Sequence, residues 1–310
     1  MSGAIPVNLP AIGNLPVIPA ITKISQSIIR ILGCNPGKMT LQGTNTYLIG
    51  SGRKRLLLDA GEPDKPKFIE NLRKVLKEEN VAIDNIVITH WHGDHLGGVK
   101  DVLAIDEAKG CKVWKFPRTD AEDSYEILPT SCKLHPLQDG QQFTMEGATI
   151  EIVHTPGHTT DHVVIKHKES GALFSGDCIL GDSTTVFEDL FDYMKSLQRI
   201  LDISPTVIYP AHGSIIENPS QRIQYYIEHR NKREKSIYDL LQAKRDKVFS
   251  TLDIVRIIYK ETPTEMWPVA AYNANHHLRK LAKEGKVREM EKDDETVWQF
   301  SDNSSKQSVL

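Results

Sequence analysis

The chain has 310 residues, 39% of them hydrophobic, and a formal net charge of -3 at pH 7. This length and composition are typical of a globular protein with a sizeable core, long enough for one large domain and a smaller one. The net charge excludes a globally basic nucleic-acid-binding surface, and four cysteines without a C-x-x-C pair exclude a dense disulfide framework.

The first 24 residues are predicted to form an N-terminal extension. They are apolar and are interrupted by prolines at positions 6, 10, 16 and 19. No unbroken apolar stretch is long enough to span a bilayer, so no membrane interaction is expected. The segment lacks acidic residues, as a mitochondrial presequence does, but it also lacks arginine. The location therefore stays open between the mitochondrial matrix and the cytoplasm.

Strand-like apolar runs dominate residues 25–219 and predict one α/β domain. The expected strands are 27–32, 45–50, 55–59, 85–89, 111–116, 148–155, 162–167, 172–177 and 206–213, with helices at 66–79, 96–108 and 189–202. Strands mixed with helices in this way indicate sheet layers that are covered by helices.

A cluster of metal-ligand residue types follows the strand predicted at 85–89. Residues 89–98 read THWHGDHLGG and contain the pattern H-x-H-x-D-H, formed by His90, His92, Asp94 and His95. A metal needs neutral imidazole or carboxylate donors that converge on one point, and His90 and His92 can share an ion on a turn that leaves a strand. Random order would give this pattern in roughly one of a thousand such chains.

Three further donors lie just beyond the end of a predicted strand: His158 in TPGH, Asp177 in FSGD and His212 in PAHG. Strand ends present side chains from a rigid scaffold. Five histidines and two aspartates in such positions predict a site for two divalent ions that share one bridging carboxylate.

The character of the chain changes near residue 220, where a smaller domain of residues 220–300 is expected, with 16 Lys and Arg against 13 Asp and Glu. Helices are predicted at 220–247, 249–260 and 270–285, and Ser250 followed by Asp253 marks the start of the second. Two alternating runs around 292–294 predict a hairpin. Helices followed by a hairpin are typical of a winged helix, and residues 301–310 are expected to form a flexible tail.

The order and spacing of H-x-H-x-D-H, T-P-G-H, a strand-end aspartate and P-x-H-G resemble the ligand set of the metallo-β-lactamase superfamily over residues 25–215. The resemblance implies an αββα sandwich with two zinc ions per chain. Carried over residue by residue, it implies that the first ion is held by His90, His92 and His158 and the second by Asp94, His95 and His212, with Asp177 as the bridge.

Two more residues take their meaning from this resemblance. Asp59 matches a strand-end aspartate that orients a ligand histidine in the superfamily. Zinc is favoured over iron because His92 stands where the flavodiiron relatives have a glutamate.

Residues 33–50, 176–190 and 226–234, together with the winged-helix end, are similar to one winged-helix-bearing group of this superfamily. That resemblance implies a metal-dependent endonuclease that cleaves single-stranded RNA in mitochondria. The corresponding hypothesis is attack on a backbone phosphorus by a zinc-activated hydroxide, with Asp94 as the catalytic residue that holds the hydroxide's proton.

Other candidate residues keep more than one interpretation. His162 supports His158, protonates the leaving oxygen or is an ordinary strand histidine. On the last helix, Arg279, Lys280 and Lys283 either contact nucleic acid or form a solvated face or the contact of a homodimer.

Two further sets of residues also have a functional and a structural interpretation. The basic residues at 230–235 either bind phosphates or pair with Glu228 and Glu234 on the surface, and Asn45 and Tyr47 are expected to be structural.

The donor set alone does not select a substrate, because the same donors serve thioester, lactam and phosphodiester hydrolysis. The chief rival to an endoribonuclease is a glyoxalase II-like thioesterase or another small-molecule ester hydrolase. A thioesterase of that kind would need a helical C-terminal half that grips glutathione, whereas this chain is predicted to end in helices followed by a hairpin.

Overall fold

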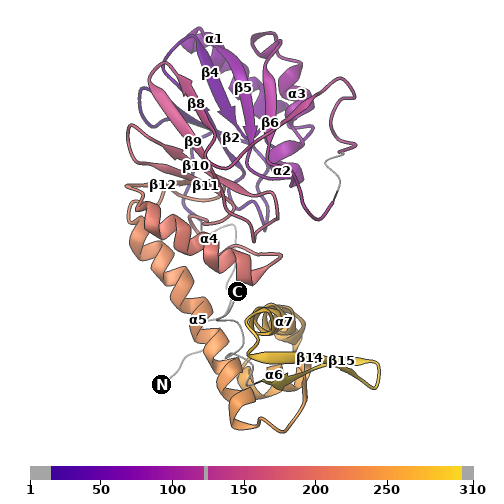
Figure 1. Cartoon of the computed structure of the whole chain (residues 1–310). Helices are drawn as coiled ribbons and strands as arrows, with labels where there is room; N and C mark the ends of the chain where they lie inside the picture. Colours follow the sequence, from indigo (N-terminus) through magenta and orange to yellow (C-terminus); the bar gives the residue numbers. More distant parts are fainter. Residues whose placement is uncertain (1–14, 122–124, 302–310) are drawn as a thin grey trace.

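The computed structural model of the protein describes residues 15–121 and 125–301, which form two lobes joined by one long helix (Figure 1). Residues 1–14 of the predicted extension and residues 302–310 of the predicted tail lie outside the described residues. The upper lobe in Figure 1 contains two β-sheets, and the lower lobe contains a small sheet packed against helices.

The first sheet of the upper lobe has seven strands that neighbour one another in chain order: β1 (Ile21–Lys23), β2 (Ile28–Leu32), β3 (Asn45–Ile49), β4 (Lys54–Leu58), β5 (Ala82–Ile88), β6 (Lys112–Lys115) and β7 (Leu134–Pro136). Strands β1 to β4 pair antiparallel, whereas β4 to β7 run parallel. Strand β1 comes from the predicted extension, so the end of that segment is an edge strand of the sheet.

The second sheet has five strands in the order β12-β11-β10-β9-β8. They are β8 (Gln142–Met145), β9 (Ala148–His154), β10 (Val163–His167), β11 (Leu173–Gly176) and β12 (Ile208–Pro210). All neighbours pair antiparallel except β11 and β12, which are parallel.

The helices of this lobe are α1 (Pro66–Glu79), α2 (Gly93–Leu96), α3 (Val99–Leu103), the 3-10 turn η2 (Asp106–Ala108) and α4 (Leu190–Ile203). The prediction of one helix over 96–108 is wrong, because the chain breaks into α2, α3 and η2. At Gly98 a Cβ atom would lie 2.1 Å from the carbonyl oxygen of Ala60, so only a glycine lets the chain pass so close to the loop that follows β4. The break leaves α2 as one short turn that carries Asp94 and His95.

Apolar side chains fill three stacked layers of core. Phe68 and Leu72 of α1 pack against the outer face of the first sheet. Tyr47 and Phe174 lie between the two sheets, where their rings contact edge to face at 4.9 Å. Tyr193 of α4, with residues of α5, covers the outer face of the second sheet. The order helix, sheet, sheet, helix confirms the predicted αββα sandwich.

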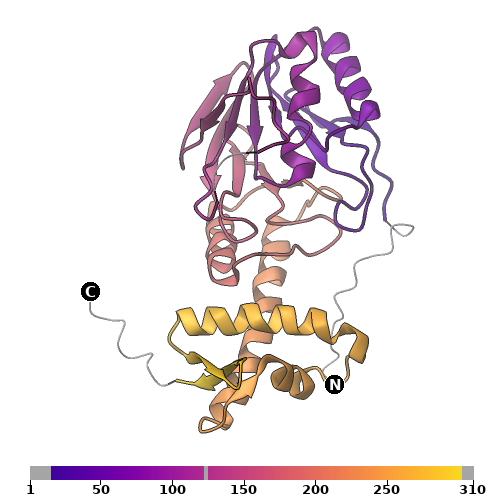
Figure 2. The same ribbon diagram turned by 90° about the vertical axis from the view of Figure 1, so that its right-hand side faces the viewer.

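The lower lobe confirms the predicted winged helix. Helix α5 (Pro219–Ala243) runs from the upper lobe into the lower one, as both views show (Figures 1 and 2). It is followed by β13 (Phe249–Ser250), α6 (Thr251–Ile258), the 3-10 turn η3 (Thr264–Met266), α7 (Trp267–Lys283), β14 (Val287–Lys292) and β15 (Glu295–Phe300), with the sheet order β13-β15-β14.

Local sequence explains where these helices begin. The Ser250 side chain accepts from the Asp253 backbone, and the Asp253 side chain accepts from the Ser250 backbone, as the predicted capping box requires. Helix α7 begins three residues before its predicted start, because Pro268 fits the first turn of a helix.

The two lobes touch through α7, which lies across the lower end of the upper lobe in Figure 2. Lys283 forms an ion pair with Asp189 at the start of α4, and the His276 ring packs edge-on against Phe187 at 5.2 Å. Among the described residues, no helix combines the length and the apolar character needed to span a membrane.

Candidate metal centre

The seven predicted donors come together at one edge of the sandwich, in loops that follow β5, β9, β11 and β12 and on the short helix α2. They form two groups, in each of which one ligand atom per residue lies within 4.8 Å of the others: His90, His92, His158 and Asp177, and Asp94, His95 and His212. Strand ends of both sheets therefore build one site, as the sequence pattern predicts.

Three imidazole nitrogens face one another in the first group. His90 Nε2 lies 2.9 Å from His92 Nδ1, and His158 Nε2 lies 3.2 Å from each of them. Nitrogen ligands of one tetrahedral zinc ion stand roughly 3.3 Å apart, because each lies about 2.0–2.1 Å from the metal. His158 donates its Nδ1 hydrogen to the Val186 carbonyl oxygen at 2.8 Å, which leaves a lone pair on Nε2.

The second group surrounds one oxygen of Asp94. Nε2 of His95 lies 3.2 Å from Asp94 Oδ2, and Nε2 of His212 lies 3.3 Å from the same oxygen. These separations again match ligands that share one ion.

Asp177 faces both groups with different oxygens. Its Oδ1 lies 3.2 Å from His212 Nε2 and 3.5 Å from His95 Nε2, whereas its Oδ2 lies 3.6 Å from His158 Nε2. This is the arrangement that a bridging carboxylate needs.

Two buried atoms indicate that the donors fit a cation. Within residues 15–121 and 125–301, His95 Nε2 and Asp177 Oδ1 are buried without a hydrogen-bond partner, and a buried polar atom left unpaired costs about 1–3 kcal/mol. Lone pairs of imidazole and carboxylate that converge in a buried space are stabilised by a positive ion between them. The donor set is therefore suited to divalent metal ions.

The electrostatics of the two groups are complementary to such ions. Burial and the neighbouring His158 ring lower the pKa of His92 to about 4, so His92 stays neutral and keeps a lone pair to donate. Burial alone would lower the pKa of His212, but Asp177 and Asp94 outweigh it and raise this pKa to about 10. The two carboxylates thus create a field that favours positive charge in the second group.

Asp59 orients His95, as the resemblance implies. Its Oδ2 accepts from His95 Nδ1 at 2.8 Å and from the Thr89 hydroxyl at 3.0 Å, and its Oδ1 accepts from the Thr89 backbone N–H at 2.8 Å. The carboxylate fixes the proton of His95 on Nδ1 and turns Nε2 towards Asp94.

His162 supports a different ligand from the one expected. Its Nε2 accepts from the backbone N–H of Asp177 at 3.0 Å, so the proton sits on Nδ1, 3.0 Å from the Thr155 hydroxyl. The hydrogen bonds of His162 therefore hold Asp177 and not His158. Since both nitrogens are engaged, neither is left to protonate a leaving oxygen.

Sequence reasoning missed two residues that hold Asp94. The Thr44 hydroxyl donates to Asp94 Oδ2 at 2.9 Å. Asn35 fixes Thr44 in turn, because its amide donates to the Thr44 hydroxyl at 3.0 Å and its Oδ1 accepts from the Thr44 backbone N–H at 2.9 Å. No motif or spacing links residues 35 and 44 to residue 94, so only the fold reveals this contact.

Asn45 and Tyr47 are structural, as expected. The Asn45 amide donates to the carbonyl oxygens of Pro210 and Gly213 at 2.9 and 3.0 Å, and the Tyr47 hydroxyl donates to Pro210 at 2.7 Å. These bonds tie the loop that carries His212 to strand β3.

The donors open into a cavity of about 360 Å³ between the two lobes. Five of them line it: His92, Asp94, His158, Asp177 and His212. The upper lobe contributes Lys38, Met39 and Thr40 and most of residues 180–187, and the lower lobe contributes Val269, Tyr272 and Asn273 of α7. The winged helix therefore forms part of the wall of the metal cavity.

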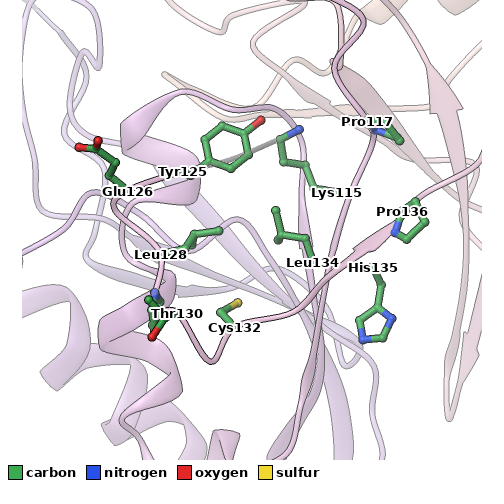
Figure 3. Close-up of a pocket in the computed structure, with 11 residues that line it drawn as sticks. Lys115, Pro117, Tyr125, Glu126, Leu128, Thr130, Cys132, Leu134, His135 and Pro136 are labelled. Atoms are coloured by element: carbon green, nitrogen blue, oxygen red, sulfur yellow. The ribbon is translucent and has the colours of Figure 1, made fainter. Parts of the chain in front are cut away.

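A larger cavity of about 540 Å³ lies beside β6 and β7, and Figure 3 shows its lining side chains. None of the seven donors lines it. The Lys115 ammonium stands 5.1 Å from the centre of the Tyr125 ring and pairs with the buried Asp161 at 2.9 Å. Asp161 belongs to the loop that carries His158, so Lys115 anchors this loop from behind. The larger volume therefore does not identify the candidate functional cavity, which is identified by the metal donors that line it.

The three candidate nucleic-acid contacts on α7 lie in different surroundings. Arg279 is exposed. Lys280 is only 8% exposed, and its ammonium bonds Glu234 at 2.7 Å and Glu284 at 2.6 Å. Lys283 pairs with Asp189 across the lobes. Lys280 is thus a correction to the prediction, because its charge is used inside the lobe and does not reach a polyanion.

The basic residues of α5 also differ from the prediction. Arg230 is buried over the Phe187 ring at 4.8 Å and lines the metal cavity, and Arg233 lies over the Tyr259 ring at 4.1 Å. Lys235 bonds Asp239 at 2.8 Å. Among the described residues, Arg230, Arg233 and Lys235 thus contact aromatic rings, the Thr185 carbonyl oxygen and Asp239. Pairing with Glu228 and Glu234 was the predicted alternative to phosphate binding.

Comparison with known proteins agrees with this geometry. A model of the metallo-beta-lactamase superfamily matches residues 39–212, and a model of the beta-lactamase associated winged helix domain matches residues 250–298. Beta-lactamase-like protein 2 homologs are similar along nearly the whole chain. The one from Drosophila melanogaster is 54% identical over 290 residues, which cover 93% of this chain and 99% of the relative. The one from Caenorhabditis elegans is 44% identical and covers 88% and 90%.

Solved structures share the fold at much lower identity. A beta-lactamase domain protein from Burkholderia ambifaria superposes with a TM-score of 0.74 at 17% identity, covering 92% of this chain and 95% of the other. A metallo-beta-lactamase family protein from Thermus thermophilus gives 0.67 at 19% identity, covering 90% and 100%. The high coverage shows that both lobes of the fold are shared.

Proposed function

This chain belongs to the metallo-β-lactamase superfamily, and from that premise we propose that it is a zinc-dependent endoribonuclease that hydrolyses phosphodiester bonds of single-stranded RNA. His90, His92 and His158 would hold one zinc ion, Asp94, His95 and His212 the other, and Asp177 would bridge them. When bound, two such ions lower the pKa of a water molecule and stabilise the negative charge that grows on phosphate oxygens.

The chain's own residues supply the precision that this chemistry needs. Asp59, Thr44 and His162 hold His95, Asp94 and Asp177 from behind. Such supporting hydrogen bonds fix the tautomer and direction of each donor, and their loss typically costs about 10- to 100-fold in metal affinity or activity. In the proposed mechanism Asp94 also orients the attacking water by accepting its hydrogen.

The choice of RNA rests on one observation, the composition of the cavity wall opposite the donors. Lys38 is exposed there and has no ion-pair partner among the described residues, so its charge is available for a phosphate. Across the cavity stands α7, the helix that in a winged helix or helix-turn-helix contacts nucleic acid.

The location in the mitochondrial matrix is part of this proposal and rests on the resemblance alone. A fluorescent fusion of the full chain, or fractionation of cells, tests it. Finding the protein in the cytoplasm alone would favour a cytoplasmic location over the mitochondrial matrix.

One assay tests the activity. The purified protein is incubated with labelled single-stranded RNA and, separately, with a glutathione thioester, each with and without a chelator. We expect internal cleavage of the RNA that the chelator abolishes and that added zinc restores. Thioester turnover without RNA cleavage would instead support the glyoxalase II-like rival.

The Asp177→Ala variant is the control for contaminating ribonucleases, because it removes an oxygen from both donor groups. Cleavage that survives in this variant at the wild-type rate would not come from the metal centre. Metal analysis of the same samples should give two zinc ions per active chain.

A further inference from the structure

The metal cavity is lined by a set of exposed apolar side chains, two from α7 and two from the upper lobe. Met39, Val186, Val269 and Tyr272 are 58%, 47%, 44% and 56% exposed, and all four line the cavity. Large apolar side chains gathered in one place on a surface are a mark of a binding site.

Tyr272 is the flat member of this set and is held in a defined position. The His276 ring, one helical turn further along α7, packs edge-on against it at 4.6 Å. His276 is itself backed by Phe187, edge-on at 5.2 Å, and Phe187 stacks on Tyr193 of the upper lobe at 5.2 Å. A chain of rings thus connects Tyr272 to the core of the upper lobe, which keeps the ring near the metal donors.

From this geometry we propose that Tyr272 is a substrate-positioning residue, on which one nucleobase of the RNA strand stacks beside the scissile phosphate. The inference rests on the proposed function. Val269, one turn before Tyr272, and Met39 and Val186 from the upper lobe would contact the edge and the far side of the base.

The chemistry of the cavity favours a base over a hydrocarbon chain. The lining also contains Ser183, Thr184 and Asn273, whose polar groups suit the donors and acceptors on a base edge. A volume of about 360 Å³ is near the lower end of ligand pockets, which span roughly 300–1,000 Å³. This space suits one nucleotide better than a folded RNA.

The same contact accounts for single-strand preference. A base can stack on a protein ring only after it has left its own neighbours in the strand, and this is least costly in unpaired RNA. A duplex of the same sequence would have to open first, so it should be cleaved more slowly.

The test uses the zinc-loaded full-length protein and a short unstructured RNA whose cleavage site has been mapped with the wild type. Tyr272→Ala, Tyr272→Phe and Tyr225→Ala are compared for kcat and KM. Tyr225 is the matched control, because it is an exposed tyrosine of α5 that does not line the metal cavity.

Stacking of one base on an aromatic ring is worth about 1–3 kcal/mol, so Tyr272→Ala should raise KM about 5- to 150-fold with little change in kcat. Tyr272→Phe keeps the ring and should behave as the wild type, as should Tyr225→Ala. Thermal unfolding of Tyr272→Ala should match the wild type, because the side chain is largely exposed.

A substrate scan adds a readout that a merely structural role would not move. RNAs are made with a single abasic nucleotide at each position beside the cleavage site. One position should raise KM in the wild type by the same factor as Tyr272→Ala, and the two changes together should raise it no further.

Each other outcome is decisive. If Tyr272→Ala cleaves RNA with the KM of the wild type, the stacking role is overturned, while the proposed function still stands. Multiplicative effects of Tyr272→Ala and every abasic substrate would also overturn it. Absence of RNA cleavage by the zinc-loaded wild type would overturn the proposed function, and turnover of a thioester that depends on Tyr272 would assign the wall to an acyl group.

Discussion

The metal cavity has a floor, formed by the metal donors, and a wall, formed by Val269, Tyr272 and Asn273 of α7. These two surfaces are built on opposite physical principles. On the floor, donors such as His95 and Asp177 are buried and fixed by hydrogen bonds from residues behind them. On the wall, Val269 and Tyr272 are exposed, and within the described part of the chain no hydrogen bond is made by their side chains.

The difference follows from what each surface has to hold. The ligand atoms of a metal must be positioned to within a few tenths of an ångström. This requires fixed rotamers and hydrogen bonds that hold each ligand side chain from behind. A surface that receives one base after another must bind each of them weakly, and ring stacking does this because every base has a flat face. Variants that disrupt one of these surfaces should therefore leave the other intact.

The largest effect is expected at the bridge. Asp177→Ala removes an oxygen from each donor group, so it should lower zinc content and reduce kcat for RNA by on the order of 10³-fold or more. The affinity for RNA, measured by fluorescence anisotropy, should change less than twofold because the α7 wall is untouched. An RNA affinity that falls in parallel with kcat would mean that floor and wall are not separable.

A smaller effect is expected where a donor is only supported. Thr44→Val removes the hydroxyl that bonds Asp94 and should reduce kcat about 10- to 100-fold with KM unchanged.

Thr46→Val is the matched control for that change, because its buried hydroxyl bonds the Ile31 carbonyl oxygen at 2.8 Å, away from the donors. Both variants should lose about 1 kcal/mol of stability in urea unfolding, but only Thr44→Val should lose activity. Equal kinetic losses would show that Thr44 acts through the fold alone.

The same contrast explains how far sequence could predict this molecule. Apolar runs predicted the strands β2 to β6 and β9 to β12 of the sandwich but missed the short strands β1, β7 and β8. Short motifs predicted all seven donors, because each donor lies a few residues past a strand end. Thr44 was not predicted, because its partner Asp94 lies 50 residues away in sequence. Tyr272 was not predicted, because nothing in its local sequence shows that α7 lies beside the metal donors. Lys280 was misassigned because its spacing on α7 does not reveal that Glu234 of α5 lies beside it.

The ion pair between α5 and α7 inside the lower lobe should affect stability more than catalysis. Glu234→Gln removes the charge that Lys280 contacts at 2.7 Å and leaves Lys280 with Glu284 alone, so unfolding free energy should fall by about 1–2 kcal/mol. Glu228→Gln, at an exposed glutamate of the same helix, should stay within about 0.5 kcal/mol of the wild type. Urea unfolding measures both.

This loss should depend on pH. Burial would raise the pKa of Glu234, but the His277 ring and the Lys280 ammonium outweigh it and lower the pKa below its ordinary value of 4.5. A carboxyl of this kind stabilises the fold fully above about pH 4.5, and the stabilisation is lost as the pH falls through its folded-state pKa. The difference between wild type and Glu234→Gln should therefore narrow below pH 4.5; a difference that widens there would contradict the ion pair.

The smallest effects are expected at the basic residues near the C-terminal end of α7, where Arg279 is exposed and Lys283 pairs with Asp189 of the upper lobe. If the RNA strand continues past Tyr272 along this helix, Arg279→Met should weaken RNA binding two- to threefold and reduce the salt dependence by about one phosphate contact, a change of roughly 0.7 in the slope. Lys283→Met should leave that slope unchanged, because the charge of Lys283 is already balanced by Asp189. Affinity measured across salt concentrations in the presence of a chelator separates the two, and equal slope changes would mean that Lys283 leaves Asp189 to contact the strand.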